Sequence, residues 1–301
     1  MLSLKTSINP KELNDFMFKY FQTKNFNMLP LSGGEFSQVF IVKIEKKDLV
    51  LRINTSIKDY LKEKFAYENF ASDRIPIPKI IDVGQVNSEY CYSLSEKAEG
   101  VTYDNLSNSQ QIKLLPNLAL YLDNIRDVDI SNKKGYGDFD KNGTAHFDSW
   151  KNYLLSINSN DDIDWEKIFK ATYFTKEIFE KIYTKLRSLA SFSPEKRYLV
   201  HSDYGYSNVL INKENVTGII DWAYAKYGDF LYDVAWLDLW SSDKRYLDFF
   251  KNHLSRKNVN LDNFEERIKV YQLHQGIGGL EFFAKSNRKE NFNWLVEKLL
   301  K

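Results

Sequence analysis

Residues 198–222 read YLVHSDYGYSNVLINKENVTGIIDW. Three short apolar runs (YLV, VLI and VTGII) frame a polar stretch at 201–208 and a later aspartate, Asp221. A carboxylate at the end of a short strand is held on a rigid support while its oxygens face outward. Asp203 can accept a proton, and Asn208 and Asp221 offer the oxygen ligands that a hard cation prefers. This set suits phosphoryl transfer, which needs a positioned nucleophile and Mg²⁺ on the phosphate oxygens.

The composition limits the class of protein. The 301 residues carry 42 Lys+Arg and 41 Asp+Glu, so the net charge is +1, which argues against a general binder of nucleic acid or of membrane surfaces. The hydrophobic share of 43% is that of a globular chain, long enough for about two lobes. One cysteine, Cys91, excludes an intrachain disulfide framework. No apolar run is long enough for a transmembrane helix and no signal peptide is evident, so we expect a cytoplasmic protein.

The residue patterns predict an α+β fold. Before Gly100 the chain is rich in strand patterns, and after it helical patterns dominate. Asp262 and Glu265 have the spacing of a capping box before a late helix. The predicted helices are 10–21, 57–71, 109–126, 148–157, 175–192 and further helices from 230 onward, and the predicted strands are 38–44, 48–53, 80–86, 90–94, 198–200, 209–211 and 216–220.

The pattern H-x-D-x-x-x-x-N followed by I-D resembles the catalytic and metal-binding loops of protein-kinase-like folds, in their aminoglycoside phosphotransferase branch. Tyr227–Ala235 (YGDFLYDVA) is similar to the G-D-x-x-Y-D-x-A stretch of that family, and the A-P-E segment of protein kinases is missing. The segments LSGGEFSQVF, VLRIN, FASDRIPIPKIIDVG, EYCYSLSEKAEGVT and IIDWAYAKYGD are most similar to hygromycin B phosphotransferases within the family. The resemblance implies a two-lobed fold, with a β-rich nucleotide-binding lobe at 1–98 and a helical lobe at 99–301 that carries the catalytic loop and the acceptor site.

Roles for the polar stretch follow from the resemblance. Asp203 would orient or deprotonate the acceptor hydroxyl, and Asn208 and Asp221 would bind Mg²⁺. His201 would brace the loop rather than react. Ser207 either contacts the nucleotide or makes a local turn hydrogen bond. Farther along the chain, the resemblance gives two aspartates, Asp229 and Asp233, structural roles as a helix cap and a brace of the catalytic loop.

The phosphate-binding side departs from the kinase pattern. The position of the usual lysine is Arg52, which can still bind phosphate with its planar fork; Lys43 follows the glycine loop too closely and falls on the preceding strand. Either Glu63 or Glu68 would pair with Arg52, and we favour Glu63. Three groups would contact the nucleotide besides these: the glycine pair Gly33 and Gly34, the hydroxyl of Ser37, and the hinge backbone of Glu96 and Ala98.

The expected partners are Mg²⁺, a nucleoside triphosphate (ATP or GTP) and a cationic aminoglycoside. Acidic residues concentrate in the later part of the chain, so the candidate acceptor ligands are Asp238, Glu265 and Glu281. The resemblance predicts an aminoglycoside O-phosphotransferase that confers antibiotic resistance, as a monomer. The alternatives are a kinase of another small hydroxylated metabolite (choline, a sugar or an amino alcohol) and a catalytically silent nucleotide-binding module.

Overall fold

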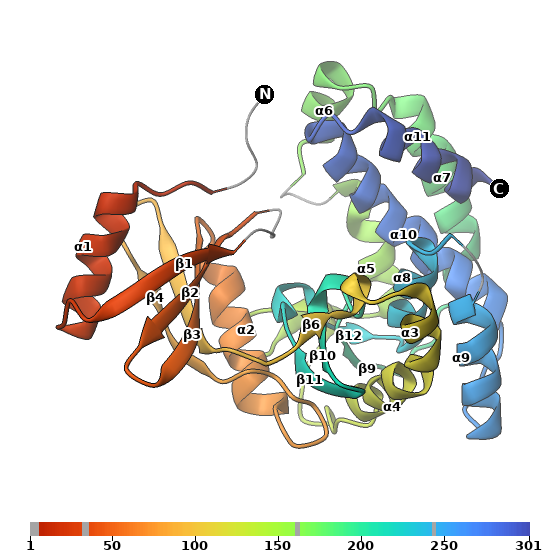
Figure 1. Cartoon of the computed structure of the whole chain (residues 1–301). Helices are drawn as coiled ribbons and strands as arrows, with labels where there is room; N and C mark the ends of the chain where they lie inside the picture. The colour runs from red at the N-terminus through yellow and green to blue at the C-terminus, as the bar shows by residue number, and fades with distance from the viewer. Residues whose placement is uncertain (1–5, 32–35, 160–162, 243–244) are drawn as a thin grey trace. The chain divides into compact units, whose positions relative to one another are not determined.

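The computed structural model describes residues 6–31, 36–159, 163–242 and 245–301. These residues form two compact units. The first contains the described residues within 1–105, 140–143 and 207–223, and the second contains those within 106–139, 144–206 and 224–301. Figure 1 shows the elements of both units, most of them labelled. No described helix is long and apolar enough to cross a membrane.

The first unit is built on an antiparallel five-stranded sheet with the order β1-β2-β3-β5-β4. A second, small sheet has the order β11-β10-β6, so a hairpin from late in the chain pairs with a strand that follows the large sheet. The elements are α1 (Pro10–Phe21), β1 (Phe26–Leu31), β2 (Gln38–Ile44), β3 (Lys47–Asn54), α2 (Ile57–Phe70), β4 (Ile80–Gln85), β5 (Cys91–Glu96), β6 (Val101–Thr102), β10 (Val209–Asn212) and β11 (Asn215–Ile219).

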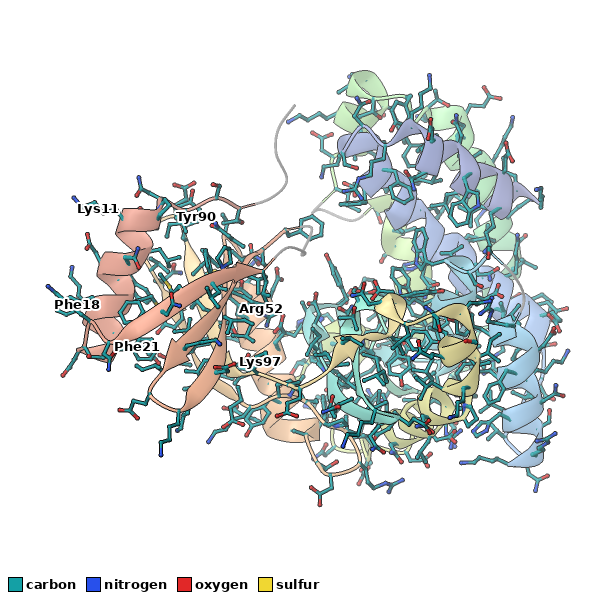
Figure 2. All side chains as sticks on the ribbon, viewed as in Figure 1. Lys11, Phe18, Phe21, Arg52, Tyr90 and Lys97 are labelled. Atoms are coloured by element: carbon teal, nitrogen blue, oxygen red, sulfur yellow. The ribbon has the colours of Figure 1, made fainter. Side chains whose placement is uncertain are left out.

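Alternation along β3 gives the large sheet two different faces. Leu51 and Ile53 are fully buried in a core that includes Leu13 and Met17 of α1. Because successive strand side chains point to opposite faces, Arg52 faces away from that core. It meets α2, and Figure 2 places Arg52 among the side chains of this unit.

The second unit is mainly helical. The 22-residue helix α10 runs through its centre and packs against α7, α8 and α11. A small antiparallel sheet with the order β8-β7-β12-β9 lies in the same unit. The elements are α3 (Asn108–Lys113), α4 (Leu115–Arg126), β7 (Tyr136–Phe139), β8 (Ala145–Phe147), α5 (Trp150–Leu155), α6 (Trp165–Ala171), α7 (Lys176–Leu189), β9 (Tyr198–Val200), β12 (Lys226–Gly228), α8 (Leu231–Leu239), α9 (Arg245–Arg256), α10 (Phe264–Lys285) and α11 (Lys289–Leu300).

The structure confirms the α+β class and the β-rich and helical parts, and it corrects some local predictions. The helix predicted at 109–126 is two helices, α3 and α4, because Leu114 ends the first and Pro116 lies in the first turn of the second. The predicted capping box at Asp262 and Glu265 is wrong. Asn263, in the left-handed region with φ of 53°, precedes α10 without a side-chain cap, and Glu265 pairs with a lysine instead.

Candidate active site

The loop between β9 and β10 has an unusual backbone. Ser202 has a φ of 74° and Tyr206 a φ of 39°, although neither is a glycine; Gly205 between them has a φ of 97°. Left-handed conformations of such residues cost about 1–3 kcal/mol each and persist only where the surroundings impose them. The surroundings of this loop must therefore supply compensating contacts.

Asp233 of α8 supplies two of these contacts. Its carboxylate accepts hydrogen bonds from the backbone N–H of His201 (2.9 Å) and of Ser202 (2.6 Å). Burial raises the pKa of Asp233 to about 7, although both backbone donors favour the ionised form. The fully buried His201 accepts through Nδ1 from the N–H of Asp203 (3.3 Å). Asp233 and His201 thus both brace the loop, in the roles that the resemblance implies for them.

Asp203 is the acidic side chain that this loop presents. It is partly exposed, whereas His201 before it and Tyr204 after it are fully buried. The Tyr204 hydroxyl donates to the carbonyl of Leu118 (3.1 Å) in α4, which anchors the chain directly after Asp203. A carboxylate held between two buried neighbours can orient and deprotonate a hydroxyl without a large rearrangement.

Asn208 and Asp221 flank the open end of the hairpin formed by β10 and β11. The register pairs Val209 with Ile219, and the N–H of Ile220 donates to the carbonyl of Asn208 (2.9 Å). Asn208 is therefore hydrogen-bonded to Ile220, the residue directly before Asp221. Asp221 itself has a left-handed backbone, with a φ of 63°. An amide and a carboxylate fit Mg²⁺, which often takes one or two protein oxygens and fills its other positions with phosphate and water. Among the described residues no group of three or more His, Cys, Asp or Glu could hold a metal.

Arg52 pairs with Glu63 of α2 through two hydrogen bonds. Nη1 lies 3.0 Å from Oε1, and Nη2 donates to Oε2. Glu68 instead lies one turn from Lys64 (3.9 Å), and Lys43 is exposed, so neither takes the alternative role that the sequence left open. Burial raises the pKa of Glu63 to about 7, and the nearby guanidinium acts in the opposite direction.

Asp221 also influences this pair. The negative charge of Asp221 contributes to the raised pKa of Glu63 and stabilises the charged form of Arg52. The charges of Arg52, which is predicted to bind phosphate, and of Asp221, a candidate metal ligand, therefore interact within the first unit. A polyphosphate with a divalent cation could bind to both at once, with its phosphate oxygens on the arginine and its cation on the aspartate.

Tyr60 is a residue of this region that the sequence reasoning missed. Its ring centroid lies 5.1 Å from the guanidinium carbon of Arg52, and its hydroxyl donates to Oγ of Ser37 (3.3 Å). Residues 52 and 60 lie on different elements, so no local spacing signals the contact. The predicted glycine pair, Gly33 and Gly34, lies outside the described residues.

The segment after β5, predicted from the sequence to be the hinge, has no helix or strand at residues 97–100. Glu96 ends β5, and its N–H donates to the carbonyl of Lys79 (2.9 Å). No hydrogen bond within the described parts of the chain uses the backbone of Ala98, so its N–H and carbonyl are available to a ligand. Lys97, the residue between them in the sequence, is labelled in Figure 2.

The three predicted acceptor ligands do not gather in one place. Asp238 is buried and accepts from Nε2 of Gln272 (2.6 Å), whereas Glu265 and Glu281 both lie on α10. Sixteen residues separate these two glutamates, which is about 24 Å along a helix. One small ligand cannot contact both. Ser207 is exposed on the 3₁₀ turn before β10.

Comparisons with known proteins agree with this geometry. A model of the phosphotransferase enzyme family matches residues 27–257. Hygromycin-B 4-O-kinase of Escherichia coli is 27% identical over 276 residues, covering 92% of this chain and 80% of the relative.

Solved structures of aminoglycoside phosphotransferases are also similar to this chain. The crystal structure of aminoglycoside phosphotransferase APH(4)-Ia has a TM-score of 0.84 and 25% identity over 97% of both chains. A thermostable mutant of that enzyme in ternary complex with ADP and hygromycin B has a TM-score of 0.84 and 26% identity over 96% of both chains. The GDP complex of aminoglycoside 2'-phosphotransferase-IIIa, 14% identical with a TM-score of 0.68 over 97% of this chain and 99% of that one, shares the fold. Because the family model covers well over half of its length, this chain belongs to the phosphotransferase enzyme family and is a small-molecule kinase.

Proposed function

We propose that this protein transfers the γ-phosphoryl group of a nucleoside triphosphate to a hydroxyl of an aminoglycoside, with hygromycin B as the first candidate, and thereby confers resistance. The main support is the similarity over 96% of both chains to a structure that holds ADP and hygromycin B. The curated relative named as a hygromycin-B kinase supports the same acceptor. ATP and GTP are both candidate donors.

In the proposed reaction the acceptor hydroxyl oxygen attacks the γ-phosphorus, and the bond from phosphorus to the bridging oxygen of the nucleoside diphosphate breaks. Asp203 orients the hydroxyl and takes its proton. Asn208 and Asp221 would hold Mg²⁺, which supplies positive charge to the phosphate oxygens. Arg52, held by Glu63, adds a second positive charge.

The other predicted contacts complete the proposal. The hinge backbone of Glu96 and Ala98 would meet the nucleotide base, and the hydroxyls of Ser37 and Ser207, with the glycine pair, would face the phosphates. Acidic side chains would bind the ammonium groups of the acceptor. Because the three acceptor candidates are spread along the second unit, we expect at most two of Asp238, Glu265 and Glu281 to contact one acceptor.

An acceptor panel with coupled detection of the nucleoside diphosphate tests the proposal. Hygromycin B comes first, followed by other aminoglycosides, choline, sugars and amino alcohols, each with ATP or GTP and with or without Mg²⁺. NMR of the product identifies the phosphorylated hydroxyl. Mg²⁺-dependent turnover of an aminoglycoside is the expected result, and turnover of choline or a sugar alone would identify a metabolite kinase. Nucleotide binding without transfer to any acceptor would indicate a silent module.

A variant links the activity to the loop. Asp203→Asn is expected to lower turnover by about 10²–10⁴-fold, the usual size of a general-base effect, without loss of folding. Asp248→Asn, which makes the same change at an exposed position on α9, is the control and should retain activity. Near-normal turnover of Asp203→Asn would remove this carboxylate from the mechanism.

A further inference from the structure

We propose that Tyr60 is a positioning residue that sets the plane of the Arg52 guanidinium for the phosphates of the donor nucleotide. The inference rests on the proposed function for the presence of that nucleotide. It assigns to the first turn of α2 a role in donor binding that the charged residues alone do not reveal.

The ring of Tyr60 restrains one face of Arg52. The side chain of Tyr60 is 1% exposed, and its ring centroid lies 5.1 Å from the guanidinium carbon. A cation over an aromatic face is held by the quadrupole of the ring. Because Tyr60 is almost fully buried, its ring is restrained by packing and offers a defined plane to the guanidinium.

Glu63 restrains a second direction. Its two carboxylate oxygens take one N–H from each terminal nitrogen of Arg52, so two of the five guanidinium N–H donors are used. A planar group held at one edge by a carboxylate and on one face by a ring cannot rotate about its long axis. The remaining donors therefore keep a fixed direction, and the Arg52 side chain retains 18% of its surface exposed.

This restraint matters because the residue is an arginine. An ammonium group is a point charge that binds phosphate from any direction, whereas a guanidinium binds best when its fork is coplanar with two acceptor oxygens. An arginine at this position therefore gains from a neighbour that fixes its plane. Tyr60 is the described aromatic residue in contact with it.

The hydroxyl of Tyr60 makes a separate contact. It donates to Oγ of Ser37, directly before β2, and so connects the first turn of α2 to the start of that strand. The two contacts can be separated experimentally. Tyr60→Phe removes the hydroxyl bond and keeps the ring, while Tyr60→Met removes both and keeps an unbranched apolar side chain of similar length.

Nucleotide binding without acceptor is the primary assay, with the equilibrium Kd of ADP and of a non-hydrolysable ATP analogue measured in the presence of Mg²⁺. Tyr60→Met is expected to raise Kd by about 3–30-fold, the range of a partly buried cation–π contact. Tyr60→Phe should stay within about threefold of wild type. In an Arg52→Lys background, which has no plane to fix, Tyr60→Met should raise Kd by less than it does with Arg52.

Steady-state kinetics separate positioning from general damage. For Tyr60→Met the KM of the donor should rise, while kcat at saturating nucleotide and the KM of the acceptor stay near wild type; a purely structural defect would lower kcat as well. An unchanged Kd in Tyr60→Met, or equal effects of the Phe and Met variants, would overturn the proposal. If Tyr60→Met does not fold, Tyr60→Leu is measured in its place, with the same expected rise in Kd and the same refuting result. A rise of Kd as large as 10-fold in Tyr60→Phe would also overturn the proposal.

The result also discriminates between the two proposals. A wild-type chain that binds nucleotide but phosphorylates no aminoglycoside refutes the proposed acceptor and leaves the role of Tyr60 measurable by binding. A wild-type chain that binds no nucleotide refutes both.

Discussion

Acidification is expected to destabilise the protein through one buried histidine, His274 of α10. Its Nδ1 lies 2.8 Å from the hydroxyl of Tyr232, and its ring centroid lies 5.3 Å from that of Tyr153. Burial lowers the pKa of His274 to about 3, with a further contribution from the positive charge of Lys226 and an opposing one from Asp138. The imidazole is thus neutral in the folded protein at any pH near neutrality.

The size of the effect follows from the two pKa values. An unfolded histidine has a pKa of about 6.5, so below that pH the unfolded chain binds a proton that the folded chain does not. The contribution of His274 to stability is therefore complete above pH ~6.5 and is lost as the pH falls toward 3. Between pH ~7.5 and ~5 the expected loss is about 2 kcal/mol in the free energy of unfolding.

Another group in the same unit acts in the opposite direction. The pKa of Asp233 is raised to about 7 by burial, so its folded form takes up a proton before its unfolded form does. Its contribution increases stability as the pH falls from about 7 to about 4. The two effects partly cancel in the wild-type protein, and for this reason the observable must be the difference between a variant and the wild type.

Urea unfolding of wild type, His274→Gln and His146→Gln between pH ~5 and ~7.5 supplies that difference. Glutamine removes the titration and can still bond to Tyr232; His146 is exposed and gives the matched control. Relative to wild type, His274→Gln should be about 2 kcal/mol more stable at pH ~5 than it is at pH ~7.5, whatever its offset at neutral pH. If the curves of His274→Gln and wild type run parallel over this range, the reasoning is wrong.

Three further outcomes are expected. Gly278→Ala should raise the free energy of unfolding by up to about 1 kcal/mol, measured by thermal unfolding, because a Cβ there meets nothing within 4 Å. Gly276→Ala should lower it, because a Cβ would lie 2.4 Å from Leu299. Arg267→Met should cost about 3–5 kcal/mol in thermal unfolding, since it leaves the fully buried Asp229 without its two-bond partner; a loss below ~1 kcal/mol would contradict this. Chelation of Mg²⁺ should abolish phosphoryl transfer and leave the melting temperature of the nucleotide-free protein unchanged.

Elements with strong local signals could be predicted from the sequence. Asn9 and Pro10 gave the start of α1 correctly, because an N-cap side chain and a proline in the first turn act within one turn of helix. The strand β1 was missed. Its residues Phe26–Leu31 include Pro30, which argues against a strand in a sequence pattern, but β1 lies at the edge of the sheet, where proline is tolerated.

In the candidate site, too, the contacts with a local sequence signal were predictable and those without one were not. The preference for Glu63 over Glu68 as the partner of Arg52 is confirmed, since strand alternation and helical spacing place both groups toward each other. Tyr60 could not be found in this way, because its role depends on where a ring lies relative to a group on another element. The roles of Asp203, Asn208 and Asp221 in catalysis and metal binding stay predictions that the proposed assays test.

The late hairpin in the first unit has a consequence for synthesis on the ribosome. Strand β6 at Val101–Thr102 pairs with β10 at Val209–Asn212, so its partner does not exist when the first hundred residues emerge. At about 5–20 residues per second, the delay before residue 223 is made is roughly 6–24 s. During that interval the nascent first unit lacks the hairpin of β10 and β11, which Asn208 precedes and Asp221 follows. A fragment ending at residue 105 should therefore be a poor nucleotide binder and a frequent client of chaperones, and separate expression of this half of the enzyme should fail unless 207–223 is supplied with it.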